Sequence, residues 1–328
     1  MRTRRSFAPL VGLFAALGAL LAAAPAIAQD YPNKPVRLIV PLSPGGVTDV
    51  MARLIATEMA KPLGQTVLVE NRTGGNGAIA GDALKQAPAD GYMVGFFPNS
   101  MTIVLPLLDK SRTALGEFKP VSRLYDLDLF VIGRSDLQAS SLQQLIAAAK
   151  TQPGKLTYGT TGVGSTLHLG FELIKAQGGF DMTHVPYKGG ADQITALIGG
   201  QITVAIVGTY DAGVWFKQGK VKLLASYGAK RNAVFPDVPT IAESGFPGFG
   251  ANSWAALFVP QGTPDAVAGK LGQAALTALR SATVKEKLLA NGLTPLGEET
   301  PAQISASMKA ESETWARVIA RLGAENLK

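Results

Sequence analysis

Two segments of the chain combine glycines, hydroxyl side chains and the start of a predicted helix. The first is RLIVPLSPGGVTD at residues 37–49, and the second is KLTYGTTGVGST at residues 155–166. In each segment an apolar run typical of a buried strand leads into a turn, and a pattern of helical period follows. A helix start leaves backbone N–H groups without partners and carries a partial positive charge, so it can bind an anion. Two such starts could hold the two ends of one small anion, which suggests a carboxylate receptor.

The first turn offers Ser43, Gly45, Gly46, Thr48 and Asp49 as candidate ligand-binding residues. The two glycines would let backbone N–H groups approach a carboxylate, although a turn that needs positive φ would also require them. Thr48 could donate its hydroxyl to the ligand or cap the helix. Asp49 would repel an anion, so we expect it to fix the loop or to orient a bound water or ammonium group.

The second turn and two strand ends supply the other candidates. The turn contributes Thr160, Thr161, Gly162, Gly164, Ser165 and Thr166, and the strand ends contribute Asn99, Ser100, Tyr210 and Asp211. The second turn could instead be an ordinary strand-to-helix connection with Ser165 as its cap. His168 lies one turn into the helix on a face that is more often core, and we expect His184 to satisfy a local hydrogen bond.

The first 28 residues are typical of a secretory signal peptide. Arg2, Arg4 and Arg5 precede an apolar stretch at residues 7–24, and Ala26 and Ala28 form a small-residue cleavage site. We expect cleavage after Ala28 and a periplasmic location, with a retained membrane anchor as the alternative. The remaining sequence contains no second apolar run long enough to span a membrane, so no stable membrane insertion is expected after cleavage.

Composition excludes several classes of function. The chain has no cysteine, which excludes disulfides, thiolate metal sites and an acylated cysteine anchor. Its formal charge is +7, of which three positive charges belong to the predicted signal peptide. The positive charges are scattered without a basic stripe, so nucleic-acid binding is not expected. A mild positive field would favour small anions.

Strand and helix patterns alternate along the chain. Beyond the two turns we predict strands at residues 65–70, 92–97, 129–133, 181–187, 202–207, 221–225 and 254–259, and helices at residues 78–87 and 301–322. This alternation predicts an α/β protein with two lobes, each a mostly parallel sheet flanked by helices, and a ligand cleft between the lobes. We expect residues 29–130 and 253–328 to form lobe 1 and residues 131–252 to form lobe 2. Trp315 in the last helix is expected to be core.

The ordered set of motifs resembles one family over nearly the whole chain after the signal peptide. The segments are YPNKPVRLIVP at 31–41, PGGVTD at 44–49, VENR at 69–72, PADGY at 88–92, YGTTGVGS at 158–165, HVPYKG at 184–189, LIGGQ at 197–201, FPDVPT at 235–240, ESGFP at 243–247 and PQGTP at 260–264. Together they resemble the substrate receptors of tripartite tricarboxylate transporters, also called Bug receptors.

The resemblance implies a periplasmic binding protein of type II fold that closes two lobes around a small carboxylate. It also implies contacts through backbone N–H groups, hydroxyls and waters, and delivery of the ligand to the membrane subunits of a transporter. The ligand could be a di- or tricarboxylate, an amino acid or an aromatic acid. We expect the receptor to be a monomer. Three segments depart from the family pattern and are expected to shape the pocket: residues 42–43, 96–100 and 207–216.

Other classes of function fit the sequence less well. A dinucleotide loop needs a third glycine where Leu167 stands, and the sequence has neither a GxxxxGK[ST] phosphate loop nor a GxSxG nucleophile elbow. Two histidines and no cysteine make a metal site improbable. We therefore predict no catalytic residue, no metal and no cofactor. A hydrolase-like enzyme remains the less favoured alternative, and a receptor that acts in signalling rather than uptake stays open.

Overall fold

The computed structural model describes residues 31–109, 117–323 and 327. The predicted signal peptide, residues 1–28, therefore lies outside the described residues. Residues 34–328 form one compact unit that contains two β-sheets with their helices. We call the six-stranded sheet and its helices lobe 1, and the five-stranded sheet and its helices lobe 2. Across the described ranges we find no helix with the length and apolar character that a membrane crossing requires.

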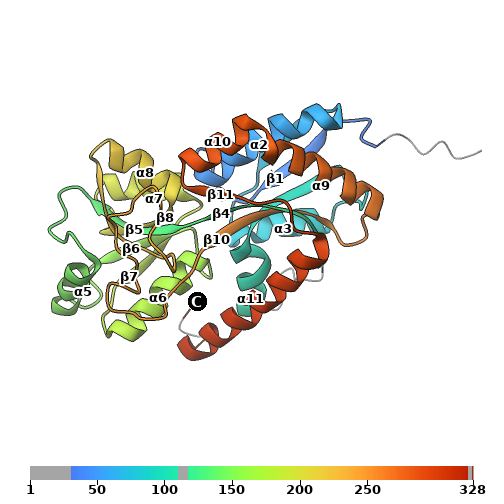
Figure 1. Cartoon of the computed structure of the whole chain (residues 1–328). Helices are drawn as coiled ribbons and strands as arrows, with labels where there is room; N and C mark the ends of the chain where they lie inside the picture. Colours follow the sequence, from blue (N-terminus) through green and yellow to red (C-terminus); the bar gives the residue numbers. More distant parts are fainter. Residues whose placement is uncertain (1–30, 110–116, 324–326, 328) are drawn as a thin grey trace, which may run out of the picture. The chain divides into compact units, whose positions relative to one another are not determined.

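The sheet of lobe 1 combines strands from both ends of the chain. Its order is β11-β4-β10-β3-β1-β2, formed by β1 (Val36–Val40), β2 (Val67–Asn71), β3 (Met93–Pro98), β4 (Phe118–Leu127), β10 (Ser253–Pro260) and β11 (Leu293–Pro295). β1 is parallel to β2 and β3, with Leu38 opposite Val69 and Val94. β10 is antiparallel to β3 and β4, and β11 is antiparallel to β4. The late strand β10 thus lies in the middle of a sheet of early strands (Figure 1).

The sheet of lobe 2 is built from the middle of the chain. Its order is β7-β6-β8-β5-β9, formed by β5 (Leu129–Arg134), β6 (Thr157–Thr160), β7 (Thr183–Pro186), β8 (Val204–Gly208) and β9 (Val221–Ser226). β6 is parallel to β7 and β8, whereas β5 is antiparallel to β8 and β9.

The two-lobed α/β fold is confirmed, and both sheets contain strands that run against the direction of the others. β5 and β10 run against their neighbours in the two sheets. The physical reason for these reversed strands is the path of the chain between the two sheets. β4 ends in lobe 1 one residue before β5 begins in lobe 2, so β5 must start at the edge where the other strands of its sheet end. β10, the first strand after lobe 2, returns to lobe 1 in the same way.

Helices cover both faces of each sheet (Figure 1). Lobe 1 carries α2 (Val47–Leu63), η1 (Gly75–Gly77), α3 (Ala78–Lys85), η2 (Ser100–Val104), α4 (Leu105–Leu108), α9 (Asp265–Arg280), α10 (Ala282–Ala290) and α11 (Pro301–Leu322). Lobe 2 carries α5 (Leu142–Thr151), α6 (Thr166–Gly178), α7 (Gly190–Ile198) and α8 (Thr209–Lys217). Local sequence explains several starts: Ser165 caps α6, and Thr300 forms a capping box with Gln303 at α11.

Two hydrophobic clusters form the core, and the larger one, based in lobe 1, also includes Leu169 of α6. In lobe 1, α11 packs Ile304, Met308 and Trp315 against a cluster that includes Trp254 of β10. The prediction that Trp315 is core is confirmed, because its side chain is buried in this cluster. In lobe 2, the core joins the sheet to α7. These clusters hold the strand ends and helix starts that meet between the lobes.

Candidate ligand-binding cavity between the lobes

A cavity of about 50 Å³ lies where strand ends and helix starts of both lobes meet. It is lined by Pro41, Leu42, Ser43, Gly46, Val47, Thr48, Asn76, Pro98, Ser100, Tyr125, Leu127, Leu129, Thr161, Leu167, Gly190, Gln193, Val207, Gly208, Asp211, Ser253, Trp254 and Ala255. A water needs roughly 10–15 Å³ on such a measure, so the cavity has room for part of a small organic molecule. A wider cleft of about 790 Å³ adjoins it and shares Pro41, Leu42, Asn76 and Thr161.

Three helix starts open on this cavity. They are α2, which contributes Gly46, Val47 and Thr48, together with α7 at Gly190 and α8 at Gly208. The residue before each first turn is a glycine, which has no side chain to cap the helix. First-turn N–H groups and the positive ends of the helix dipoles therefore point to one small volume. Such an arrangement is suited to binding an anion.

The turn before α2 also holds the two lobes together. The N–H of Ser43 donates to the carbonyl oxygen of Lys188 at 3.2 Å, and its hydroxyl donates to Asp192 Oδ2 at 2.7 Å. A Cβ placed on Gly46 would lie 3.7 Å from the backbone nitrogen of Gly190. The loop of lobe 1 is thus in contact with the start of α7 in lobe 2, as a closed receptor requires.

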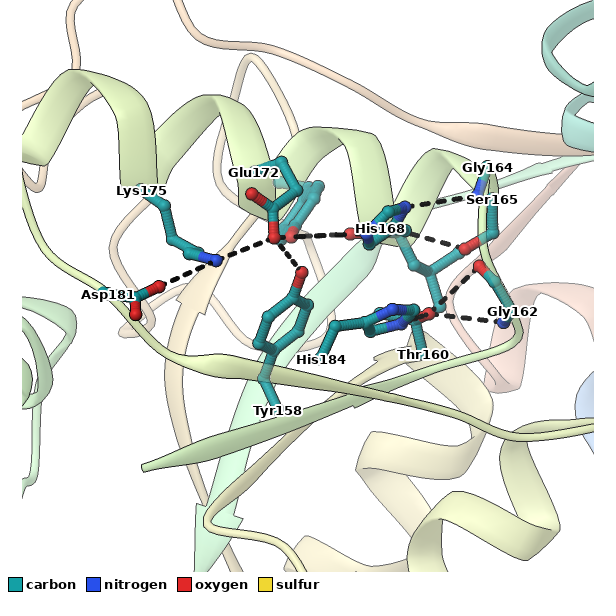
Figure 2. A network of polar contacts seen from close by, with 12 residues as sticks. Tyr158, Thr160, Gly162, Gly164, Ser165, His168, Glu172, Lys175, Asp181 and His184 are labelled. Atoms are coloured by element: carbon teal, nitrogen blue, oxygen red, sulfur yellow. Dashed lines mark hydrogen bonds and ion pairs between the residues drawn. The ribbon is translucent and has the colours of Figure 1, made fainter. Parts of the chain in front are cut away.

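The polar groups of the turn before α6 form hydrogen bonds largely within their own lobe (Figure 2). Thr160 Oγ1 lies 2.7 Å from His184 Nε2, and the N–H of Gly164 donates to His168 Nδ1 at 3.2 Å. The Ser165 hydroxyl accepts from the N–H of His168, which makes it the helix cap. These groups serve the loop itself, and within the turn it is Thr161 that lines the cavity.

Two stacked histidine rings form hydrogen bonds with this turn. The rings of His168 and His184 lie 4.1 Å apart between centroids. Burial lowers the pKa of His168 to about 4, and burial together with its neighbour His168 lowers the pKa of His184 to about 3. Both imidazoles are therefore neutral at physiological pH and act as hydrogen-bonding and packing groups.

The histidine pair predicts a loss of stability in acid. The unfolded chain protonates histidine near pH 6.5, whereas the folded protein resists protonation, so stability present above pH 6.5 is lost as pH falls toward the folded-state values. For His184 this lowers the free energy of unfolding by about 2 kcal/mol between pH 7 and pH 5. We expect this decrease to be absent in His184→Gln, whose side-chain amide can replace Nε2 as a hydrogen-bonding group. Urea unfolding of both proteins at these two pH values checks this. An identical pH dependence in the variant would contradict it.

Asp211 is the buried carboxyl of the cavity wall. It stands in the first turn of α8, and its carboxyl accepts a hydrogen bond from the N–H of Val47 at the start of α2 in the other lobe. A Cβ on Gly190 would lie 2.5 Å from Asp211 Oδ2, so this oxygen lies against the start of α7. Burial raises the pKa of Asp211 to about 7, although the Val47 hydrogen bond acts in the opposite direction.

The residues selected from the sequence fall into two groups. Those that line the cavity are Ser43, Gly46, Thr48, Ser100, Thr161 and Asp211. Gly162 lines the adjoining cleft instead. The lining does not include Gly45, Asp49, Asn99, Thr160, Gly164, Ser165, Thr166 or Tyr210. Each of the three segments that depart from the family pattern contributes lining residues, namely Leu42 and Ser43, Pro98 and Ser100, and Val207, Gly208 and Asp211.

Asp49 holds the first loop in shape. Its carboxylate accepts hydrogen bonds from the N–H of Gly45 at 3.0 Å, from Asn71 Nδ2 at 2.9 Å and from Arg53 Nε at 3.1 Å. Burial alone would raise the pKa of Asp49, but these hydrogen bonds, led by that of Arg53, lower it below its usual value. The carboxylate therefore has partners in its own lobe, which agrees with the expectation that it fixes the loop.

Asn99 joins three elements behind the cavity wall. Its Oδ1 accepts from the Ser253 hydroxyl at 3.0 Å, and its Nδ2 donates to Glu311 Oε1 of α11 at 2.7 Å. Glu311 also accepts from the indole N–H of Trp254, a residue of the cavity lining. Asn99 thus positions β3 and β10 at the ligand cavity.

Sequence reasoning missed several lining residues. They include Asn76, Tyr125, Gly190, Gln193, Gly208 and Trp254. The glycines before α7 and α8 carried a usable signal, since each follows a strand and precedes a helical pattern, as at Gly46. Gln193 is fully buried, and its amide nitrogen donates to the carbonyl oxygens of Gly159 and Ile206 in the orientation that satisfies both groups. The sequence alone does not indicate this role of Gln193, because it depends on how α7 packs on the sheet.

Comparison with known proteins agrees with this geometry. The model of the tripartite tricarboxylate transporter family receptor, TctC, matches residues 51–324. The chain belongs to this receptor family. Protein BugT of Bordetella pertussis is 35% identical over 319 residues, which cover 96% of this chain and 97% of BugT. The expectation of a substrate-binding receptor rather than an enzyme is thereby confirmed.

Solved structures of family members share the fold. The periplasmic binding protein BugD aligns with a TM-score of 0.86 at 29% identity, covering 90% of this chain and 99% of BugD. MatC from Rhodopseudomonas palustris, solved with bound malate, has a TM-score of 0.84 at 29% identity, covering 88% of this TctC-family chain and 100% of MatC. Rpa4515 of R. palustris, solved with adipate, has a TM-score of 0.85 at 32% identity, covering 90% of this chain and 99% of Rpa4515.

Proposed function

We propose that this TctC-family receptor binds one small carboxylate in the cavity between its lobes and delivers it to the membrane subunits of a tripartite tricarboxylate-type transporter. The observation that carries the proposal is the meeting of three uncapped helix starts at one cavity. Malate in MatC and adipate in Rpa4515 support a carboxylate ligand.

The ligand carboxylate would be held by neutral donors. Among the lining residues that the structure describes, none is lysine, arginine or histidine. Donors to a ligand oxygen include first-turn N–H groups of α2 and α7, apart from that of Val47, which donates to Asp211. The hydroxyls of Thr48, Ser100 and Thr161 also line the cavity, as does Asn76, whose Nδ2 is buried without a hydrogen-bond partner among the described residues. Affinity in the micromolar range, about −8 kcal/mol, is sufficient for a receptor and can be reached with such contacts.

Capture would proceed by closure of the lobes. We propose that residues 29–130 and 253–328 move as lobe 1 against residues 131–252 as lobe 2, with the signal peptide removed after Ala28 and the receptor acting as a periplasmic monomer. The Ser43 contacts with Lys188 and Asp192 are then made only in the closed state. Hinge closure around a ligand is a common motion in periplasmic binding proteins.

A thermal-shift panel on residues 29–328 tests the binding. It would contain succinate, malate, citrate, adipate, aspartate, glutamate, nicotinate and benzene dicarboxylates. A ligand at 100 times its dissociation constant is expected to stabilise the protein by about 2.7 kcal/mol. If native mass spectrometry shows the protein empty and no carboxylate raises its melting temperature, the proposed function is wrong.

Delivery to a transporter needs a cellular test. Uptake of a radiolabelled ligand from the panel is expected to stop when the membrane subunits are deleted, although the receptor still binds. Uptake that continues, or a ligand-dependent transcriptional response that persists without the subunits, would favour the signalling alternative.

A further inference from the structure

Asp211 places a carboxyl where a receptor for anions would be expected to have none. Among the described residues that line the cavity, Asp211 is the single carboxylic acid, and no lysine, arginine or histidine accompanies it. Its side chain is 6% exposed. A ligand that carries only negative charges would bring them beside this carboxyl without a cation between them, which is unfavourable in a buried site.

Burial disfavours the charge of Asp211, but its polar neighbours favour the ionised form. The carboxyl accepts from the N–H of Val47 at the start of α2, and Oδ2 lies against Gly190 at the start of α7. Two helix starts thus face an anion that belongs to the protein itself. Asp211 itself lies in the first turn of α8, where a negative charge is also favoured. One carboxylate can accept several hydrogen bonds, so acceptor capacity remains on the side that faces the cavity.

We infer that Asp211 sets ligand specificity by accepting a hydrogen bond from a protonated amine of the ligand, so that the receptor selects amino-substituted carboxylates over their deaminated counterparts. This inference rests on the proposed carboxylate-binding function and names its ligand class. The ammonium group neutralises Asp211, while the ligand carboxylate takes the remaining helix N–H groups and hydroxyls. A buried acceptor left unpaired discriminates strongly against the analogue that lacks the donor.

An ordinary structural role for Asp211 makes a different prediction. The hydrogen bond to Val47 joins the two lobes, so Asp211 could serve only to hold them closed. Asp211→Asn retains a side-chain oxygen that can accept from Val47, but it replaces the second oxygen with a donor and removes the charge. The variant therefore preserves the link between the lobes and abolishes recognition of an ammonium group.

Matched pairs of probes test the inference by calorimetry at pH 8. The pairs are aspartate and succinate, glutamate and glutarate, 2-aminoadipate and adipate, and phenylalanine and 3-phenylpropionate. In the wild type, the amino member of the pair that fits is expected to bind at least about tenfold more tightly. In Asp211→Asn this preference is expected to disappear. Ser100→Ala, which changes an uncharged lining side chain, is expected to weaken both members of the pair equally.

The outcomes separate this inference from the proposed function. A wild-type receptor that binds the deaminated member as tightly as the amino member overturns the inference and leaves the carboxylate-binding function intact. A preference that persists in Asp211→Asn, or the failure of every amino-bearing probe to bind, also overturns it. Failure of all carboxylates, with or without an amine, rejects the function itself.

Discussion

Replacing Gly46 with leucine is expected to raise the dissociation constant for the ligand by about 5- to 150-fold or more, while the isolated fold remains stable. A Cβ at this position would lie 3.7 Å from the backbone nitrogen of Gly190 and 3.8 Å from that of Ala191. A methyl group fits there, but a branched side chain would overlap the start of α7. Overpacking of this kind costs about 1–3 kcal/mol, and the closed state alone bears that cost.

Gly46→Ala is the matched control for this prediction. The φ and ψ angles of Gly46 are −78° and 169°, an extended conformation that alanine adopts without strain. Alanine should therefore bind ligand nearly as the wild type does. Calorimetric titration of both variants, with the melting temperature of each ligand-free protein as a check on folding, gives the comparison. Wild-type affinity in Gly46→Leu would show that the α2 and α7 starts do not close on the ligand.

Removing the Asp211 carboxyl is expected to stabilise the ligand-free protein at alkaline pH. Burial raises the folded-state pKa of Asp211 to about 7 from an ordinary value of 3.8. Between these values the folded protein retains a proton that the unfolded chain has lost, so stability that is present at pH 4 declines as pH rises through 7. Each pKa unit corresponds to about 1.4 kcal/mol, which gives an upper limit of about 4 kcal/mol.

Urea unfolding of the wild type and Asp211→Asn at pH 4.5, 6 and 8 measures this effect. The histidine pair changes stability in the opposite direction over part of this range, so the difference between the two proteins is the informative quantity. We expect the variant's advantage to grow from a small value at pH 4.5 to a few kcal/mol at pH 8. A constant difference would mean that Asp211 is ionised throughout and that burial does not disfavour its charge.

The sequence was most informative where the signal was local. The predicted helix over residues 301–322 is observed at Pro301–Leu322, because Thr300, Pro301 and Gln303 specify its start within four residues. The turn before α2, which the sequence also indicated, contributes Ser43 and Gly46 to the cavity lining. Capping chemistry and helical periodicity act over one or two turns, so a single sequence contains them.

The function of individual polar groups could not be predicted in the same way, because their partners are distant in the chain. Asn99 has the pattern of a ligand donor at a strand end, yet it binds Glu311, 212 positions later. Thr160 is satisfied by His184, 24 positions away. The acceptor role of Asp211 toward Val47 arises only when two lobes meet. Whether a donor remains free for a ligand is thus decided by tertiary contacts, which periodicity and turn chemistry do not specify.

The directions of the strands also depend on tertiary structure that the sequence pattern does not specify. The apolar runs that form β5 and β10 were recognised as strands, but alternation with helices predicted mostly parallel sheets and did not indicate which strands would be reversed. Their reversal follows from the passage of the chain between two sheets. A topology in which the chain crosses twice therefore places two antiparallel strands beside the cavity.

The most direct test of the account is calorimetric titration of residues 29–328 with each carboxylate that raises the melting temperature and with its primary amide. The central claim is that helix-start N–H groups and hydroxyls hold a ligand carboxylate. We predict one ligand per receptor, micromolar affinity for the carboxylate, and binding of the amide that is at least about tenfold weaker. Equal affinity for the carboxylate and its amide would contradict the account, because the cavity would then recognise shape without recognising charge.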